Sequence, residues 1–142
     1  MFSPAGSVTW RVMLRHFPRS DRQLALAALD RVGMLPFALQ RADRLSGGQQ
    51  QRVAIARALA QQSRFVLADE PVASLDPESA RSVLSILREI ARERMIPVLV
   101  SLHQVDFALQ FADRVIGLRA GRVIADRSAS FAETDRRMIF ST

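Results

Sequence analysis

The chain has 142 residues, enough for one domain with a hydrophobic core. It has no cysteine, which excludes disulfides and thiol chemistry, and no apolar run near the roughly 18 residues that a membrane helix needs. The net charge is +6, and all twenty basic residues are arginine. The arginines are scattered and no aromatic residues interleave with them, so we expect no nucleic-acid partner.

The N-terminal third is predicted to be helical after a first segment of loop or frayed helix, residues 1–18. Ser20 is expected to cap a helix, with Gln23 at the capping-box position, and Gly33 is expected to end it. The expected apolar face is formed by Leu24, Ala27, Ala28, Leu29 and Val32. Residues 35–40 are predicted to form a short helical turn, and residues 41–44 a polar lead into the next helix.

Ser46, Gly47, Gly48 and Gln49 stand at the start of a predicted helix that runs to about Ala60. Glycines in a first turn let a ligand approach the free N–H groups, and the helix dipole favours an anion there. Ser46 and Gln49 also fit a capping box, which is a purely structural explanation. Val53, Ala56, Leu59 and Ala60 are expected to face the core, with Arg52 and Arg57 outward.

An apolar run from Phe65 to Ala68 follows and is predicted to be a buried strand that ends in Asp69 and Glu70. Open α/β sheets bind their ligands at this end of their strands. One carboxylate can hold Mg²⁺, and its neighbour can take a proton from an attacking water. A solvated strand end is the structural alternative for this pair taken alone.

The remaining elements alternate in the same way. Asp76 and Pro77 are predicted to begin a helix that ends near Arg94, and a second buried strand, residues 97–102, ends at His103. A helix over 104–111, a hairpin with strands 115–118 and 123–125, and a terminal helix over 131–140 are expected to follow. This order predicts an α/β fold with a mostly parallel sheet and flanking helices.

The segments Leu45 to Gln49 and Phe65 to Glu70 resemble the signature motif and the Walker B strand of the ATP-binding subunits of ABC transporters. The resemblance covers essentially residues 6–139 and implies a partial P-loop NTPase fold. Residues 1–44 would be part of the helical subdomain. Residues 45–142 would be the C-terminal part of the ATPase core.

The resemblance also implies roles for single residues. Asp69 would position Mg²⁺, Glu70 would polarise the water that attacks ATP, and His103 would match the switch histidine that touches the γ-phosphate. Asp76 lies in a match to the D-loop at the dimer interface. Residues 46–49 would bind the γ-phosphate of a nucleotide held mainly by the other subunit.

Residues 68–81 and 102–108 resemble the phosphonate importer branch, because many other branches have Thr-His-Asp where this chain has Leu102-His103-Gln104. The implied protein is a transport ATPase that lies peripherally on the cytoplasmic face of the inner membrane. Its implied partners are a second ATP-binding subunit, membrane permease subunits and, indirectly, a periplasmic substrate-binding protein. Two alternatives stay open: a permease-docking module without enzyme activity, and an ABC-type ATPase of DNA repair or chromosome organisation.

A P-loop, G-x-x-x-x-G-K-[ST], needs a lysine for the β- and γ-phosphates, and this chain has none. We therefore interpret the chain as an N-terminally truncated fragment and expect no ATP hydrolysis by it alone. By the family's sheet order the P-loop strand would lie between strands 97–102 and 115–118. Both strands are therefore expected to keep an unpaired edge.

Overall fold

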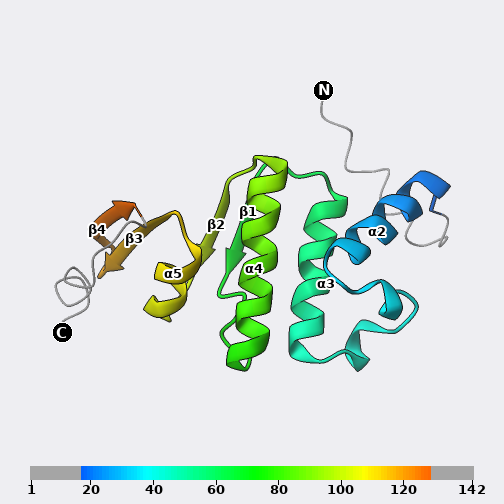
Figure 1. Ribbon diagram of the computed structural model, residues 1–142, viewed down its shortest axis with the longest axis horizontal. Coiled ribbons are helices and arrows are strands. Elements are labelled where there is room, and N and C mark those ends of the chain that lie inside the picture. The colour runs from blue at the N-terminus through cyan, green and yellow to red at the C-terminus, as the bar shows by residue number, and fades with distance from the viewer. Residues whose placement is uncertain (1–16, 129–142) are drawn as a thin grey trace. The chain divides into compact units, whose positions relative to one another are not determined.

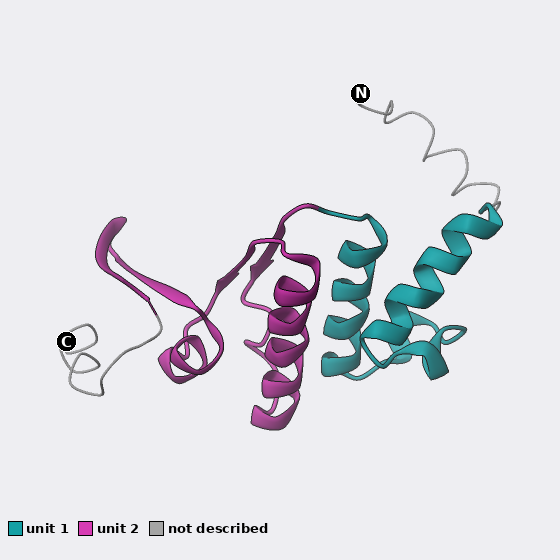
Figure 2. Cartoon of the chain, turned by 45° about the horizontal axis from the view of Figure 1, so that its top comes forward, with its two compact units in different colours: residues 1–63 teal, residues 64–142 magenta. Residues whose placement is uncertain are grey.

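The computed structural model describes residues 17–128 of the chain. The chain divides into two compact units, residues 1–63 and residues 64–142, which are described separately (Figure 2). Figure 1 labels the helices and strands. No helix within the described residues is long and apolar enough to cross a membrane.

The first unit begins with α2 (Arg19–Arg31), whose start differs from the prediction. Pro18, not Ser20, is the N-cap residue, and its carbonyl accepts the first helical hydrogen bond from Arg22 N at 3.2 Å. The Ser20 hydroxyl lies inside the first turn, where it donates to Asp21 Oδ1 at 3.3 Å. The predicted Ser20 cap is therefore wrong, because the extended backbone of Pro18 already turns the chain into the helix.

The end of α2 is the one predicted from Gly33. Gly33 adopts a φ of +69°, and its N–H donates to Asp30 O while Met34 N donates to Leu29 O. This pair of bonds is a Schellman motif, which satisfies the last carbonyls of the helix. Val32 and Met34, on either side of the glycine, are each only 1% exposed.

Two short 3₁₀ turns, η1 (Leu35–Phe37) and η2 (Ala42–Arg44), connect α2 to α3 (Gly47–Ala60), and α2 packs against α3. The buried residues of α3 are Ile55, Ala56 and Leu59. The predicted face therefore holds at Ala56 and Leu59, whereas Val53 and Ala60 are half-buried and Ile55 was not anticipated. Ala28 of α2 and Val32, the C-cap residue, are buried as predicted, but Leu24 and Ala27 are exposed. Arg52 is half-buried rather than outward.

The second unit contains a parallel β-α-β arrangement. Strand β1 (Val66–Asp69) pairs with β2 (Val98–Ser101) in a register that sets Asp69 beside Ser101. Helix α4 (Pro77–Arg94) connects them and buries one face, made of Ala80, Val83, Leu84, Leu87 and Ile90. Helix α4 contacts β2 and the short helix α5 (Val105–Phe111). The predicted α/β class and the parallel pairing are confirmed.

The last described element pair is an antiparallel hairpin of β3 (Arg114–Arg119) and β4 (Arg122–Ser128). Its two-residue turn, Ala120-Gly121, has positive φ at both positions, +48° and +74°. Next to the turn Arg119 pairs directly with Arg122, and at the open end Arg114 forms an ion pair with Asp126 at 2.6 Å.

The two pairs of strands form separate two-stranded sheets. Within the described residues β2 pairs only with β1 and β3 only with β4. The predicted terminal helix over 131–140 and the predicted loop over residues 1–16 lie outside the described residues.

Candidate functional site

The side chains predicted to carry chemistry in the second unit meet where β1 and β2 end. Both strands run in the same direction, so Asp69 and Ser101, their last residues, lie side by side at one edge of the sheet. Glu70 follows directly after β1, and His103 follows two residues after β2. The β-α-β connection thus brings together groups that are 31 to 33 positions apart in the sequence.

Ser101 is hydrogen-bonded to both acidic residues. Its hydroxyl donates to Asp69 Oδ1 at 2.6 Å and accepts from the backbone N–H of Glu70 at 2.9 Å. Glu70 itself adopts a left-handed backbone conformation with a φ of +45°, which is uncommon for a residue other than glycine. The chain therefore bends sharply between the two carboxylates.

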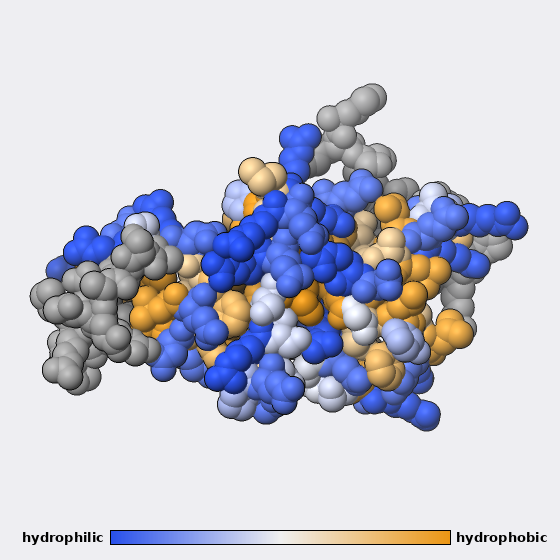
Figure 3. Space-filling model, in the orientation of Figure 1, coloured by the Kyte–Doolittle hydropathy of each residue, from blue (hydrophilic) through white to orange (hydrophobic). Residues whose placement is uncertain are grey.

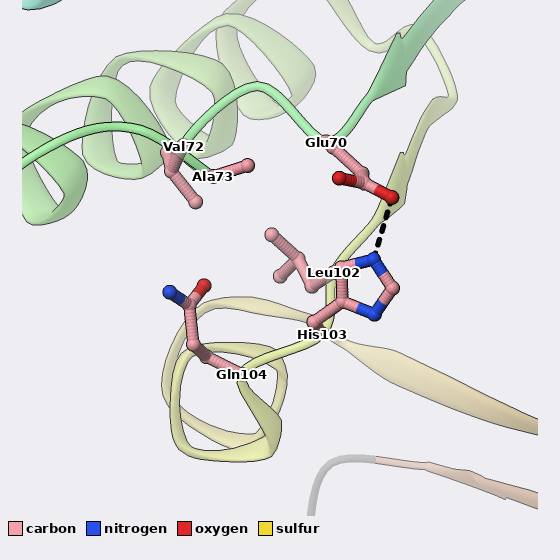
Figure 4. A pocket seen from close by; sticks show the side chains of 6 residues that line it. All are labelled: Glu70, Val72, Ala73, Leu102, His103 and Gln104. Atoms are coloured by element: carbon pink, nitrogen blue, oxygen red, sulfur yellow. Dashed lines mark hydrogen bonds and ion pairs between the residues drawn. The ribbon is translucent and has the colours of Figure 1, made fainter.

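The Glu70 carboxylate points toward the imidazole of His103, as Figure 4 shows, with Oε1 and His103 Nε2 2.5 Å apart. The two side chains are 45% and 79% exposed, so water screens their attraction and the pair adds little to stability. Both residues line a pocket of about 90 Å³ together with Val72, Ala73, Leu102 and Gln104. Ligand pockets usually measure about 300–1,000 Å³, so this pocket has room for a small group and not for a whole nucleotide.

The arrangement supplies one carboxylate for a cation and a second carboxylate next to a histidine. No group of three or more His, Cys, Asp or Glu side chains that could hold a metal occurs among the described residues. Mg²⁺ is commonly held by one or two carboxylates, with water and substrate phosphates as its other ligands. Asp69 fits that role, because it is a single carboxylate at the exposed edge of the sheet.

Asp76 is engaged in a structural interaction. Its Oδ1 accepts hydrogen bonds from Glu78 N at 3.1 Å and Ser79 N at 2.9 Å, so Asp76 is the N-cap of α4. The Ser79 side chain, and then the backbone N–H groups of Ser79 and Glu78, hold the pKa of the Asp76 carboxyl below its usual range. The capping role predicted for Asp76 is confirmed, and its role toward a nucleotide stays a prediction.

The start of α3 belongs to the first unit. Ser46 Oγ accepts from Gln49 N at 3.3 Å, and Gln49 Oε1 accepts from Ser46 N at 2.9 Å, which is a complete capping box. Gly47 and Gly48 form the first turn, where a helix leaves backbone N–H groups without intrahelical partners. Ser46, Gly47 and Gln49 are thus placed as predicted at a helix N-terminus, and binding of an anion there stays a prediction.

Ser101 was not anticipated as part of the site. Its only signal in the sequence is a polar residue at the end of an apolar run, two positions before His103. That signal is weak, because many strands end in serine.

The sequence profile of the ABC transporter family matches residues 6–73. Among curated relatives, the phosphonates import ATP-binding protein PhnC of Shigella dysenteriae is 56% identical over 127 residues, which is 89% of this chain and 48% of the relative. Over most of its length the chain is similar to ATP-binding proteins of the ABC transporter family. The PhnC protein of Frankia casuarinae is 59% identical over 119 residues, which is 84% of this chain and 47% of that protein. The chain therefore spans about half the length of the curated relatives it matches.

Solved ATP-binding cassettes of the ABC transporter family have the same fold. The chain superimposes on cbiO1 of Clostridium perfringens, part of the transporter complex cbiONQ, with a TM-score of 0.77 at 29% identity over 94% of this chain and 52% of that one. A dimeric ATP-binding cassette in a post-hydrolysis state, bound to ADP and Pi, gives a TM-score of 0.68 at 34% identity over 82% of this chain and 51% of that one.

Proposed function

We propose that this chain forms part of the ATP-hydrolysing subunit of an importer for phosphonates, on the cytoplasmic face of the inner membrane. The observation that carries the proposal is the meeting of Asp69, Glu70 and His103 at the ends of two parallel strands. The identity of 56% to 59% with phosphonates import ATP-binding proteins supports the choice of transported substrate.

The proposed chemistry is attack of water on the γ-phosphate of ATP. Glu70 accepts a proton from that water, and His103, in contact with Glu70 Oε1, keeps the carboxylate in place beside the γ-phosphate. Asp69 would hold Mg²⁺, which would supply positive charge next to the phosphates. Since phosphoryl transfer depends mainly on positioning and charge, the hydrogen bonds that orient these side chains matter as much as their acidity.

In this proposal the first unit binds a second ATP molecule, not the one that Glu70 acts on. Residues 46–49 bind the γ-phosphate of ATP held by a second ATP-binding subunit, with the first turn of α3 as the anion site. Asp76, at the start of α4, lies at the contact between the two subunits. The dimeric cassette that binds ADP and Pi supports such a pairing. The 142 residues contain no lysine, so the P-loop lies outside them, and the purified chain should hydrolyse no ATP.

The test replaces Glu70 by Gln in the only cellular copy of the protein. We expect growth on a phosphonate as the sole phosphorus source to stop, while growth on inorganic phosphate continues. Glu78→Gln is the matched control, because Glu78 is an exposed carboxylate whose backbone N–H, not its side chain, makes the α4 cap. Growth of the Glu70→Gln strain on phosphonate at the wild-type rate would overturn the proposal.

A second proposed function is docking on a membrane permease, which the exposed hydrophobic side chains of the first unit favour. Hydrophobic side chains lie on the surface over α2 and η1 (Figure 3), and the exposed ones are Leu24, Leu26, Leu35, Phe37 and Leu39. Leu39, just after η1, is fully exposed. Exposed apolar surface of this kind is typical of a protein contact.

The docking activity can be tested without nucleotide. The wild-type chain should co-purify with the permease subunits, and Leu39→Ser should reduce the recovered permease. Leu67→Ser, which removes a leucine that is 68% exposed in the other unit, is the control. Equal recovery with both variants would count against docking through this surface.

A further inference from the structure

The end of the parallel sheet places Ser101 where it can act on both acidic residues. Side chains alternate between the two faces of a strand, so Leu67 and Asp69 of β1 share a face with Leu99 and Ser101 of β2. All four residues are exposed. The register pairs Asp69 with Ser101, so the hydroxyl is the neighbour of the carboxylate across the sheet.

The Ser101 hydroxyl makes one bond as a donor and one as an acceptor. A hydroxyl has a single hydrogen to donate, and here that hydrogen goes to Asp69 Oδ1 at 2.6 Å, a length typical of a charge-assisted bond. An oxygen lone pair accepts from Glu70 N–H at 2.9 Å. One side chain thus fixes the carboxylate of Asp69 and the backbone of the next residue.

The bond to the Glu70 N–H lies at the point where the backbone is least favourable. A φ of +45° is costly for glutamate and persists where surrounding contacts hold it. This conformation turns the chain after Asp69, so that the Glu70 side chain points to His103, as Figure 4 shows. Ser101 therefore holds the turn that gives neighbouring carboxylates two different partners.

We propose that Ser101 is a positioning residue for the hydrolysis, acting through Asp69 and Glu70 without touching ATP. The inference rests on the proposed function, since it assigns Asp69 to the cation and Glu70 to the water. Without the hydroxyl, the Asp69 carboxylate loses its partner across the sheet, and the Glu70 N–H loses its acceptor. Both carboxylates can then rotate away from their places.

The first arm of the test uses Ser101→Thr and Ser101→Val in the purified 142-residue chain. The two side chains have nearly the same shape and suit a strand, but only threonine carries the hydroxyl. Amide hydrogen exchange by NMR should show the Glu70 N–H protected in the wild type and in Ser101→Thr, and unprotected in Ser101→Val. The Val66 amide, which donates to Pro97 O, should stay protected in all three and so reports an intact sheet.

The second arm measures ATP hydrolysis by the transport complex purified from cells that carry each variant as the only copy. Ser101→Val should lower kcat on the order of 10- to 100-fold, with the KM for ATP little changed, and Ser101→Thr should restore kcat. A protected Glu70 amide in Ser101→Val would overturn the inference, and so would an unchanged kcat. A wild-type complex without ATPase activity would instead overturn the proposed function, and the NMR arm, which needs no nucleotide, would still show whether Ser101 holds Glu70.

Discussion

The polar cluster at the start of α3 and the polar cluster at the ends of β1 and β2 are built in opposite ways. At the start of α3 the bonds between Ser46 and Gln49 join residues three positions apart, and the helix alone suffices to form them. At the end of β1 and β2 the bonds among Asp69, Glu70, Ser101 and His103 join residues 31 to 33 positions apart. These bonds exist only when the parallel sheet has formed.

The difference shows which part of the proposed machinery depends on the fold of the second unit. The capping box keeps the first turn of α3 in shape as a local property of the sequence. The strand-end cluster has no such local support, because Asp69 and Glu70 point to different partners. A change in the packing of α4 on the sheet should therefore disturb the carboxylates and leave the α3 start intact.

The largest effect is expected from His103→Ala, which breaks the strand-end cluster without touching the core. Hydrolysis of ATP by the purified complex should fall on the order of 10²- to 10⁴-fold, because Glu70 loses the group that holds it. The His103 side chain is mostly exposed, so chemical denaturation should show little change in stability. Gln110→Ala, a change at an exposed position of α5, is the control and should leave the rate unchanged. A wild-type rate in His103→Ala would remove His103 from the mechanism.

Leu87→Ala should weaken the packing of the buried face of α4. Leu87 is 2% exposed on the buried face of α4, so the cavity should lower the free energy of unfolding by about 2–5 kcal/mol. Urea denaturation followed by circular dichroism measures this change. Leu39→Ala, at a fully exposed leucine, should stay within about 0.5 kcal/mol of the wild type. Equal losses in the two variants would contradict the assignment of the α4 face to the core.

Two substitutions at Ser46 separate its structural role as the N-cap of α3 from its proposed role in binding the γ-phosphate. Ser46→Ala removes the cap and should cost about 1 kcal/mol of unfolding free energy. Ser46→Asp keeps a good N-cap but sets a negative charge where the γ-phosphate should bind. It should therefore retain stability and lose ATP hydrolysis by the complex. Full activity in Ser46→Asp would show that no anion binds at this helix start.

The smallest expected effect is a loss of stability at low pH, caused by protonation of Asp76. Hydrogen bonds from Ser79 and Glu78 lower the pKa of Asp76 in the folded chain. The ionised carboxylate therefore stabilises α4 at any pH above the pKa of aspartate in the unfolded chain, about 3.9. This stabilisation is lost as the pH falls through the lower pKa of the folded chain. Thermal unfolding between pH 6 and pH 2 should show it. Asp76→Asn, also a good cap but uncharged, should lose less stability below about pH 4. Identical acid curves would argue that Asp76 does not cap α4 through its charge.

Local signals in the sequence predicted the elements well. Asp76-Pro77 marked the start of α4, Gly33 marked the end of α2, and the apolar runs marked β1 and β2. The misses were positions where local rules compete. At the start of α2 both Pro18 and Ser20 can begin a helix, and in the structure Pro18 is the N-cap residue.

The site was predicted only in part, because some of its residues have a local signal in the sequence and others have none. Asp69 and His103 were found because each stands at the end of an apolar run, and Glu70 because it comes directly after Asp69. Ser101 was missed because its role depends on the register of β1 against β2, which no local pattern determines. The left-handed turn at Glu70 was likewise invisible, since glutamate gives no signal for positive φ.

The turn of the β3–β4 hairpin has a consequence for how that ribbon opens. Such two-residue turns favour asparagine or glycine at the first position, where this chain has Ala120, and like charges directly opposite, as in Arg119 and Arg122, repel. The Arg114–Asp126 pair holds the other end. The hydrogen bonds between β3 and β4 should therefore open first next to the turn. Proteolysis and spin labels should detect this motion at Gly121 before they detect it at the other end of the hairpin. Ala120→Asn combined with Arg122→Glu should close it.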